Sequence, residues 1–187
     1  IKVMCAVICD GSFITDNPNS NYCRFHIKKE RKKERLRAIF TEAKIEWREA
    51  SSATEGYTDL YIQAPMRVKE FGAEWYSCSS SQLQVICDNI MFWDGSENIT
   101  KNNVKRRRFS TSIKATADFV QFAFSACGYR ASVLESNRSG QEYFTCEKWY
   151  TRKSTEYIVN VTERNMVGIC CDNRPDHAKT VPQQVAT

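Results

Sequence analysis

Long apolar runs are missing from this sequence. No stretch of its 187 residues approaches the ~20 consecutive apolar positions that a membrane-spanning helix needs, and none has the pattern of a signal peptide. We therefore expect no membrane partner. The chain starts inside its first apolar segment, as we expect of a piece excised from a longer protein.

Close pairs of metal-binding residues are missing as well. The nine cysteines are scattered without a CxxC pair, and His26 has no second histidine nearby. Zinc frameworks usually show ligand pairs at set spacing, so neither residue type favours a zinc site. The odd number of cysteines favours reduced, mostly buried thiols.

The chain contains enough apolar residues for a core and a modest excess of positive charge. Its length and its 42% hydrophobic content suit one domain or a pseudo-symmetric pair of small units. The net charge is +5, but seven Lys or Arg residues lie in 28–37 and four follow one another in 105–108. A single charged run usually marks a solvated face. Two runs at matching places favour a polyanionic partner.

The apolar segment 81–93 predicts a buried helix that ends at Asp94-Gly95, where the glycine predicts a sharp turn. The helix dipole disfavours an anion at a C-terminus, so the position of Asp94 favours a nearby cation. The same Asp-Gly-Ser triplet begins at Asp10, 84 positions earlier, and it also follows an apolar segment. Taken alone, Asp-Gly at a helix end is common as a simple turn, but the matched pair favours a functional role.

The offset of 84 recurs along the chain. It pairs Phe25 with Phe109 and Phe40 with Phe124, so the sequence indicates two copies of one structural unit. Each copy is predicted to contain a helix, two strands, a second helix and two further strands. We place the first copy at 1–78, the second at 79–171 and a loose tail at 172–187, with one more strand at 166–171.

The second copy is predicted to be longer than the first. Aligning Tyr157 with Tyr61 gives an offset of 96, which leaves twelve extra residues in the second copy. The aromatic and basic stretch within 138–153 accommodates them, and we expect it to form a longer hairpin.

Matching strands in the two copies carry basic residues. Residues 22–28 alternate, so Cys23, Phe25 and Ile27 are predicted to face a core. The other face carries cationic and hydrogen-bonding side chains, namely Tyr22, Arg24, His26 and Lys28. The strand at 105–113 is predicted to present the equivalent set, which consists of Arg106, Arg108, Ser110 and Ser112.

Two αββαββ units joined through twin helices that each end in Asp-Gly resemble the LAGLIDADG homing endonucleases. The signature helices would lie at 3–11 and 89–95, and Trp93-Asp94-Gly95-Ser96 with the later Gly128-Tyr129 is similar to the endonuclease domains of inteins. The resemblance covers roughly residues 1–170. It implies an α+β fold in which two pseudo-symmetric repeats form a DNA-binding saddle. It also implies a monomer with internal two-fold pseudo-symmetry.

The resemblance implies cleavage of a long double-stranded DNA site inside a cell, in the cytoplasm of a prokaryotic or phage-infected host. Asp10 and Asp94 would lie side by side and hold Mg²⁺ or another divalent ion, which lowers the pKa of the attacking water. Lys28 would support the transition state or simply contact phosphate. The DNA-contacting side chains would be those of the two strand faces, with the exposed residues reading base edges: Tyr22, Arg24, His26, Lys28, Arg106, Arg108, Ser110 and Ser112.

The sequence departs from the family pattern where the signature helices would cross. Small residues are usual there, and Cys5 and Cys9 fit, but the equivalents in the second copy are the bulky Asn89 and Trp93. Lys28 corresponds to Ser112, so any help from a lysine is not symmetric. These departures favour one weaker active site or a nicking enzyme. The alternatives are a maturase or regulator that has lost cleavage on the same scaffold, and an inert intein insert.

Overall fold

The computed structural model describes residues 1–14, 17–99, 105–145, 148–152 and 154–162. The predicted strand at 166–171 and the tail at 172–187 lie outside the described residues. The first half contains α1 (Lys2–Asp10), β1 (Gly11–Phe13), β2 (Tyr22–Ile27), α2 (Glu30–Glu42), β3 (Trp47–Ser51) and β4 (Thr58–Gln63). The 3₁₀ helix η1 (Ala73–Ser77) follows. The second half contains α3 (Ser80–Trp93), β5 (Gly95–Ile99), β6 (Lys105–Thr111), α4 (Lys114–Ala126), β7 (Arg130–Ser136), β8 (Glu142–Thr145), β9 (Lys148–Thr151) and β10 (Glu156–Thr162).

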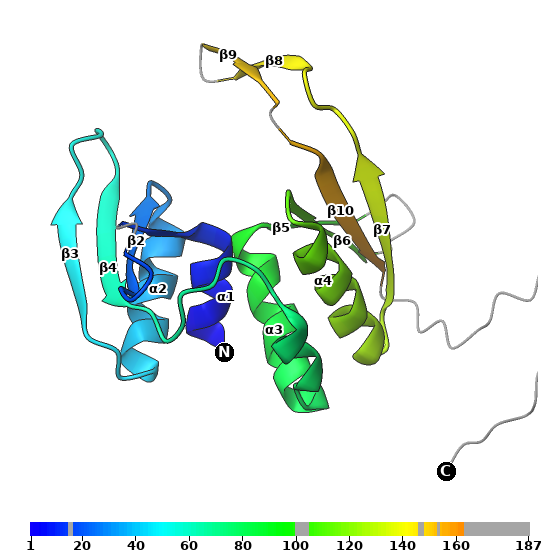
Figure 1. Cartoon of the computed structure of the whole chain (residues 1–187), viewed down its shortest axis with the longest axis horizontal. Coiled ribbons are helices and arrows are strands. Elements are labelled where there is room, and N and C mark those ends of the chain that lie inside the picture. Colours follow the sequence, from blue (N-terminus) through cyan, green and yellow to red (C-terminus); the bar gives the residue numbers. More distant parts are fainter. Residues whose placement is uncertain (15–16, 100–104, 146–147, 153, 163–187) are drawn as a thin grey trace, which may run out of the picture.

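Two four-stranded antiparallel sheets flank a central pair of helices (Figure 1). The strand orders β1-β2-β4-β3 and β5-β6-β10-β7 are equivalent, and α1 and α3 lie side by side between the sheets. Helix α2 contacts the first sheet and α4 the second. The structure therefore confirms the predicted α+β fold of two pseudo-symmetric αββαββ repeats. Among the described residues, none of the helices combines the length and apolar character that crossing a bilayer requires.

The strand register reproduces the predicted offset. Gly11 lies opposite Phe25 in the first sheet, and Gly95 lies opposite Phe109 in the second, 84 positions later in both strands. One inner face of each sheet is apolar, as alternation predicted: Phe25 and Phe109 are almost completely buried. The repeat is therefore built into the hydrogen bonding as well as into the order of elements.

The predicted offset of 96 for the closing strand is wrong. Leu60 pairs with Phe25, and Val159 pairs with Phe109, so the two closing strands are related by an offset of 99. The second repeat therefore carries 15 extra residues rather than twelve. The Tyr-Ile dipeptides at 61–62 and 157–158 that suggested 96 are a coincidence of sequence, because strand pairing sets the register.

The connection between the repeats packs on the second repeat. Phe71 and Trp75 are buried, and the ring of Phe71 stacks on Phe119 of α4 with a centroid distance of 4.8 Å. The backbone N–H of Phe71 donates to Thr116 Oγ1 at 3.2 Å. One continuous hydrophobic cluster includes these residues and the cores of both repeats, so the two halves share one core.

The two Asp-Gly junctions are tight for a reason that differs from the prediction. Gly11 has φ −75° and ψ 154°, an extended conformation open to any residue, so it makes no left-handed turn. A Cβ at Gly11 would lie 2.7 Å from Cys23 Sγ and 2.8 Å from the carbonyl oxygen of Val7. At Gly95 a Cβ would lie 2.4 Å from the carbonyl oxygen of Met91. Glycine is needed because each strand leaves against the backbone of the preceding helix.

Candidate nucleic-acid interface and acidic centre

The two predicted acids lie at equivalent helix ends. Asp10 is the last residue of α1, and Asp94 is the C-cap of α3, the helix packed beside it. Partial burial raises the pKa of the Asp94 carboxyl, and the negative charge of Asp10 raises it further. The structure therefore brings the two carboxylates into one electrostatic neighbourhood.

Lys32 supplies the cation that the helix-end acids favour. Its Nζ donates to Asp10 Oδ2 at 2.5 Å, and the two side chains are only 13% and 18% exposed. The ammonium also lies 5.9 Å from the centre of the Trp93 ring on α3. Sequence reasoning counted Lys32 only as part of a charged run. The available signal was its position one turn before the buried Leu36, on the inward face of α2.

Lys69 is a second lysine of the centre that sequence reasoning missed. Its Nζ donates to the carbonyl oxygens of Val7, Ile8 and Gly11 at 2.6, 2.7 and 2.6 Å. These bonds add a donor at the C-terminus of α1, where intrahelical donors run out, and the carbonyl oxygen of Val7 also accepts from the backbone N–H of Gly11. Burial lowers the pKa of Lys69, opposed by nearby acidic groups that include Asp94 and Asp10. No local pattern marks Lys69, because it arrives from the connection after β4.

At the helix crossing, polar contacts hold Asn89, and Lys32 lies over the ring of Trp93. Cys5 is fully buried, and burial raises the pKa of Cys9, whose thiol hydrogen-bonds Asp94. On α3, Asn89 Oδ1 accepts a hydrogen bond from Arg35 Nη2 of α2 at 2.8 Å, and Asn89 Nδ2 donates to the carbonyl oxygen of Val85 at 2.7 Å. Asn89, the bulky equivalent of Cys5, is therefore held by a side chain of α2.

The acidic centre suits a hard divalent ion. Asp10 and Asp94 are oxygen donors of the kind that Mg²⁺ and Ca²⁺ prefer. Burial and the neighbouring charge of Asp10 raise the pKa of Asp94, and both effects disfavour two ionised carboxylates side by side without a bound cation. Within the described part of the chain, no group of three His, Cys, Asp or Glu residues could hold a metal ion. An ion at the two carboxylates would therefore need further ligands from outside the protein, such as phosphate oxygens and water.

The first sheet presents the predicted polar face as a set of linked side chains. Arg48 Nη2 donates to the hydroxyl oxygen of Tyr22 at 3.0 Å. His26 Nδ1 lies 2.7 Å from Asp59 Oδ1, and its ring stacks on Tyr57 with a centroid distance of 4.3 Å. Arg24 lies between these two groups along β2, and its buried Nε has no hydrogen-bond partner among the described residues.

Lys28 is exposed at the end of β2 and lies near the β3–β4 turn. Its Nζ is 5.8 Å from the centre of the Tyr57 ring. The lysine in contact with Asp10 is instead Lys32. A catalytic role for Lys28 stays a prediction, and phosphate contact suits its exposed place.

The second sheet has a polar hollow on the matching face. Arg106 and Arg108 are exposed, and Arg108 Nη2 lies 3.9 Å from Glu156 Oε1. A hollow of about 420 Å³ lies over this face. Sequence reasoning missed the cross-strand neighbours that complete the face, which the strand register would have located: Ser96, Asn98, Asn160 and Thr162. Ser110 and Ser112 line a different hollow at the other end of β6.

Most of the basic run at 28–37 is bound within the protein. The guanidinium groups of Arg31 and Arg35 lie 5.1 and 5.6 Å from the centre of the Phe92 ring of α3. Lys33 pairs with Glu30, and Arg37 pairs with Glu30 and Glu49. Part of the positive charge of this run therefore stabilises the contact between α2 and α3, in addition to any contact with an outside partner.

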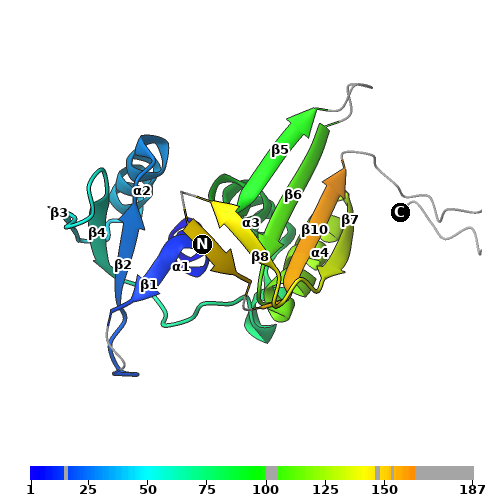
Figure 2. The same ribbon diagram turned by 90° about the horizontal axis from the view of Figure 1, so that it is seen from above.

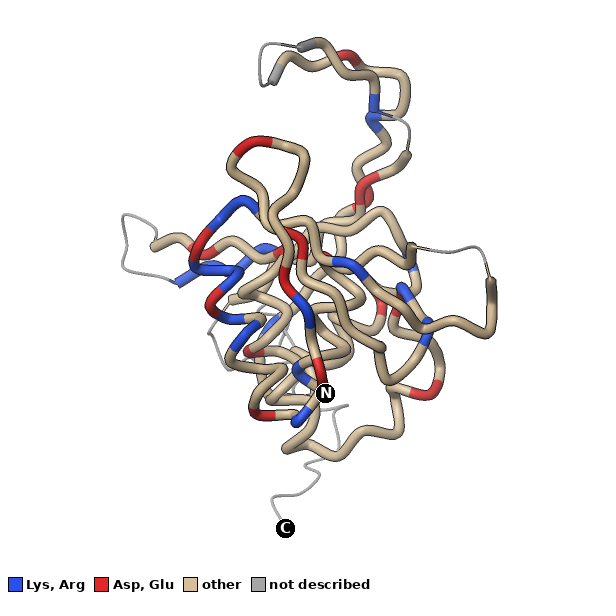
Figure 3. The backbone as a smooth tube through the Cα atoms, turned by 90° about the vertical axis from the view of Figure 1, so that its left-hand side faces the viewer, with Lys and Arg blue, Asp and Glu red and all other residues tan. Residues whose placement is uncertain are grey.

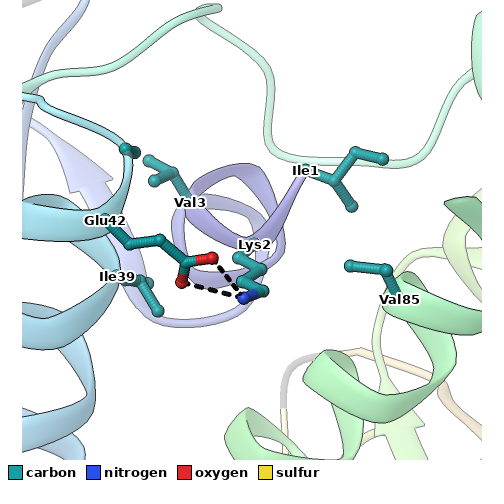
Figure 4. Close-up of a pocket in the computed structure, with 7 residues that line it drawn as sticks. Ile1, Lys2, Val3, Ile39, Glu42 and Val85 are labelled. Atoms are coloured by element: carbon teal, nitrogen blue, oxygen red, sulfur yellow. Dashed lines mark hydrogen bonds and ion pairs between the residues drawn. The ribbon is translucent and has the colours of Figure 1, made fainter.

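A separate hollow lies at the opposite end of α1 (Figure 4). There Lys2 Nζ donates to both carboxylate oxygens of Glu42, at 2.6 and 2.8 Å. Ile1, Val3, Ile39, Ala43 and Val85 complete its wall. Because Asp10 ends the other side of the helix, this hollow is no part of the acidic centre.

The fold is that of LAGLIDADG proteins. The structure matches the N-terminal LAGLIDADG domain of DUF199/WhiA with a TM-score of 0.51 and 6% identity, over 84% of this chain and 72% of that one. It matches the homing endonuclease I-DmoI bound to DNA and Ca with a TM-score of 0.54 and 12% identity, over 87% of this chain and 82% of that one. A complex of I-DmoI with DNA and Mn matches with a TM-score of 0.50 and 13% identity, over 86% of each chain. No family model and no curated protein sequence matches the chain.

Proposed function

We propose that this protein is a site-specific DNA endonuclease that hydrolyses phosphodiester bonds in a long double-stranded target. The observation that carries the proposal is the pair of acids at the ends of α1 and α3, set between two sheets with polar faces. The similarity to I-DmoI, whose structures are complexes with DNA and Ca or Mn, supports it. The neighbours share the fold at low identity, so the activity is our inference.

The sheet faces would bind the duplex before the acids act. Arg24, Arg106 and Arg108 would contact base edges or phosphate, with Ser96, Asn98 and Asn160 completing the face of the second sheet. Such contacts make affinity fall as salt rises. We expect the protein to act as a monomer, because its two repeats already supply both sheets.

Asp10 and Asp94 would hold the divalent ion and orient the water that attacks the scissile phosphate. When bound, the ion would lower the pKa of that water and offset charge on the phosphate. Lys32 would leave Asp10 as the ion arrives, and its ammonium could then face the substrate. Lys69 would keep the end of α1 in place by holding three carbonyl groups.

The experiment separates cutting from binding. A randomised duplex library is incubated with the protein and Mg²⁺, and the cut ends are sequenced. Asp10→Asn and Asp94→Asn should abolish cleavage while leaving binding intact, because neither change alters the sheets. Asp88→Asn is the matched control, since Asp88 is an exposed acid of α3 that accepts a hydrogen bond from Gln84 Nε2 one turn away. Normal cutting by both acid variants would assign the acids a structural role.

A DNA-binding regulator without cleavage is the second candidate. The similarity to the LAGLIDADG domain of DUF199/WhiA favours it, as does the ion pair of Asp10 with Lys32. A regulator would select a duplex from the library in Mg²⁺ yet leave it uncut. A nicking enzyme would yield ends on one strand alone.

A further inference from the structure

The second repeat carries an arm that the first repeat lacks. Within the described part of the chain, strands β8 and β9 pair only with each other, and they extend the β7–β10 hairpin past the sheet. Figures 1 and 2 show this hairpin bending back over the gap between the two sheets, and Figure 3 shows it standing above the rest of the molecule. The arm therefore projects beyond one end of the second sheet and reaches over the gap between the two sheets (Figures 1 and 2).

The arm carries exposed aromatic side chains on both of its faces. Tyr143 lies opposite Tyr150 and Phe144 opposite Trp149, so neighbouring pairs point in opposite directions. The side chains are 40%, 43%, 59% and 68% exposed in that order, and none belongs to the hydrophobic core. A two-stranded hairpin alone is only marginally stable in water. Clustered exposed aromatic side chains usually mark an interaction surface, so the arm is a candidate for one.

The base of the arm is continuous with the polar face of the second sheet. The guanidinium of Arg152 lies 5.0 Å from the centre of the Tyr143 ring and pairs with Glu156 at 3.4 Å. Between the arm and the end of β6 lies a hollow of about 340 Å³ whose walls are rich in hydroxyl groups: Ser110, Thr111, Ser112, Thr151, Ser154 and Thr155. Hydroxyl groups and arginine are common partners of phosphate and sugar in DNA complexes.

We propose that the β8–β9 arm contacts the sugar–phosphate backbone of a DNA duplex held on the second sheet. This inference rests on the proposed function, because the sheets would place the duplex beneath the arm. The aromatic rings pack against deoxyribose, and Arg152 with the hydroxyl-lined hollow contacts phosphate. Contacts to sugar and phosphate carry no sequence information, so the arm lengthens the residence of the duplex and leaves the choice of sequence to the sheets. Because the first repeat has only a short β3–β4 turn, the protected length of DNA is asymmetric.

The arm can be shortened without disturbing the sheet. Gly140 N donates to the carbonyl oxygen of Arg152 at 2.9 Å, and Arg152 N donates to that of Gln141 at 3.0 Å, so the strands are already held together at the base. Replacing residues 142–151 with Asn-Gly therefore closes the hairpin with a favoured two-residue turn. A milder variant, Phe144→Ser with Trp149→Ser, keeps the arm and removes one aromatic face. The control is Tyr76→Ser with Phe122→Ser, a pair of exposed aromatics on η1 and α4.

The test measures binding apart from cleavage. The wild-type protein selects a duplex from the randomised library in Ca²⁺, and the dissociation rate and hydroxyl-radical footprint of each variant are then measured on that duplex. We expect both arm variants to dissociate about tenfold faster or more. Their footprint should shorten on the side of the second repeat alone, and the control should match the wild type.

The outcomes separate this inference from the proposed function. Unchanged footprints and rates in the arm variants would overturn the arm as a DNA contact, whether or not the wild type cuts. Self-association that is lost in those variants, with unchanged footprints, would assign the arm to a protein partner instead and overturn the inference too. Loss of cutting in Mg²⁺ with the arm effect retained would overturn the endonuclease alone. Failure of the wild type to select any duplex would overturn both.

Discussion

At the scale of single residues, Lys32 has the most direct influence on the acidic centre. It lies on α2, yet it bonds the last residue of α1 and its ammonium approaches the last residue of α3. Its equivalent in the second repeat, at the offset of 84, is Thr116, a buried hydroxyl that accepts from the connection. The two halves of the centre therefore differ in charge.

Replacing Lys32 with Met leaves Asp10 partly buried at a helix C-terminus without its cation. In EDTA we expect the free energy of unfolding to fall by about 2 kcal/mol, measured by urea denaturation. Mg²⁺ should then stabilise the variant more than the wild type, because it meets no competing ammonium at Asp10. Lys33→Met, which removes a pair with the exposed Glu30, should change stability by less than about 1 kcal/mol in either condition. Equal gains from Mg²⁺ in variant and wild type would argue against an ion at Asp10.

The sequence allowed us to predict features that depend on neighbouring residues, but not contacts between residues that are far apart along the chain. Alternation along β2 predicted that Cys23 and Phe25 are buried, and the structure confirms it. The cap of α3 was also predictable, since Ser79 and Gln82 form a capping box. Lys69 could not be foreseen, because its three acceptors lie about sixty positions away along the chain and only tertiary packing brings them together.

At the scale of elements, the end of α1 depends on a side chain from outside the helix. Lys69→Met would remove one donor from each of three carbonyl groups at the end of α1, of which that of Val7 also accepts from the N–H of Gly11. We expect a loss of about 2–4 kcal/mol in the free energy of unfolding, together with faster amide hydrogen exchange in the last turn of α1. Lys2→Met, which breaks an ion pair with the exposed Glu42, should cost about 1 kcal/mol or less. Unchanged exchange at residues 8–11 would contradict this capping role.

The sequence predicted where the helices and strands lie better than it predicted why they end or pair as they do. Asp-Gly was correctly predicted to end both helices, but glycine was explained by a sharp turn, whereas close backbone packing requires it at Gly11 and Gly95. The closing strand of the second repeat was predicted correctly, but its offset from the first repeat was three positions too small. The prediction relied on a repeated Tyr-Ile dipeptide, whereas the offset is set by strand pairing, which a single sequence does not reveal.

At the scale of the whole molecule, the connection fastens the repeats into one unit. Phe71→Ala would open a cavity against Phe119 of α4, and we expect it to cost about 3–5 kcal/mol of unfolding free energy. Because one core includes both repeats, thermal unfolding should stay a single transition at a lower temperature. Phe122→Ala, on the exposed side of α4, should cost about 1 kcal/mol. Two separate calorimetric transitions in the Phe71 variant would contradict a shared core.

The extra residues of the second repeat enter the chain between β7 and β10, beyond the paired residues of the sheet. Growth or trimming at that place leaves the register of every other strand pair as it is. Under the proposal that the arm contacts DNA, exchanging this segment would change how long a duplex stays bound while the residues at the ends of α1 and α3 remain the same.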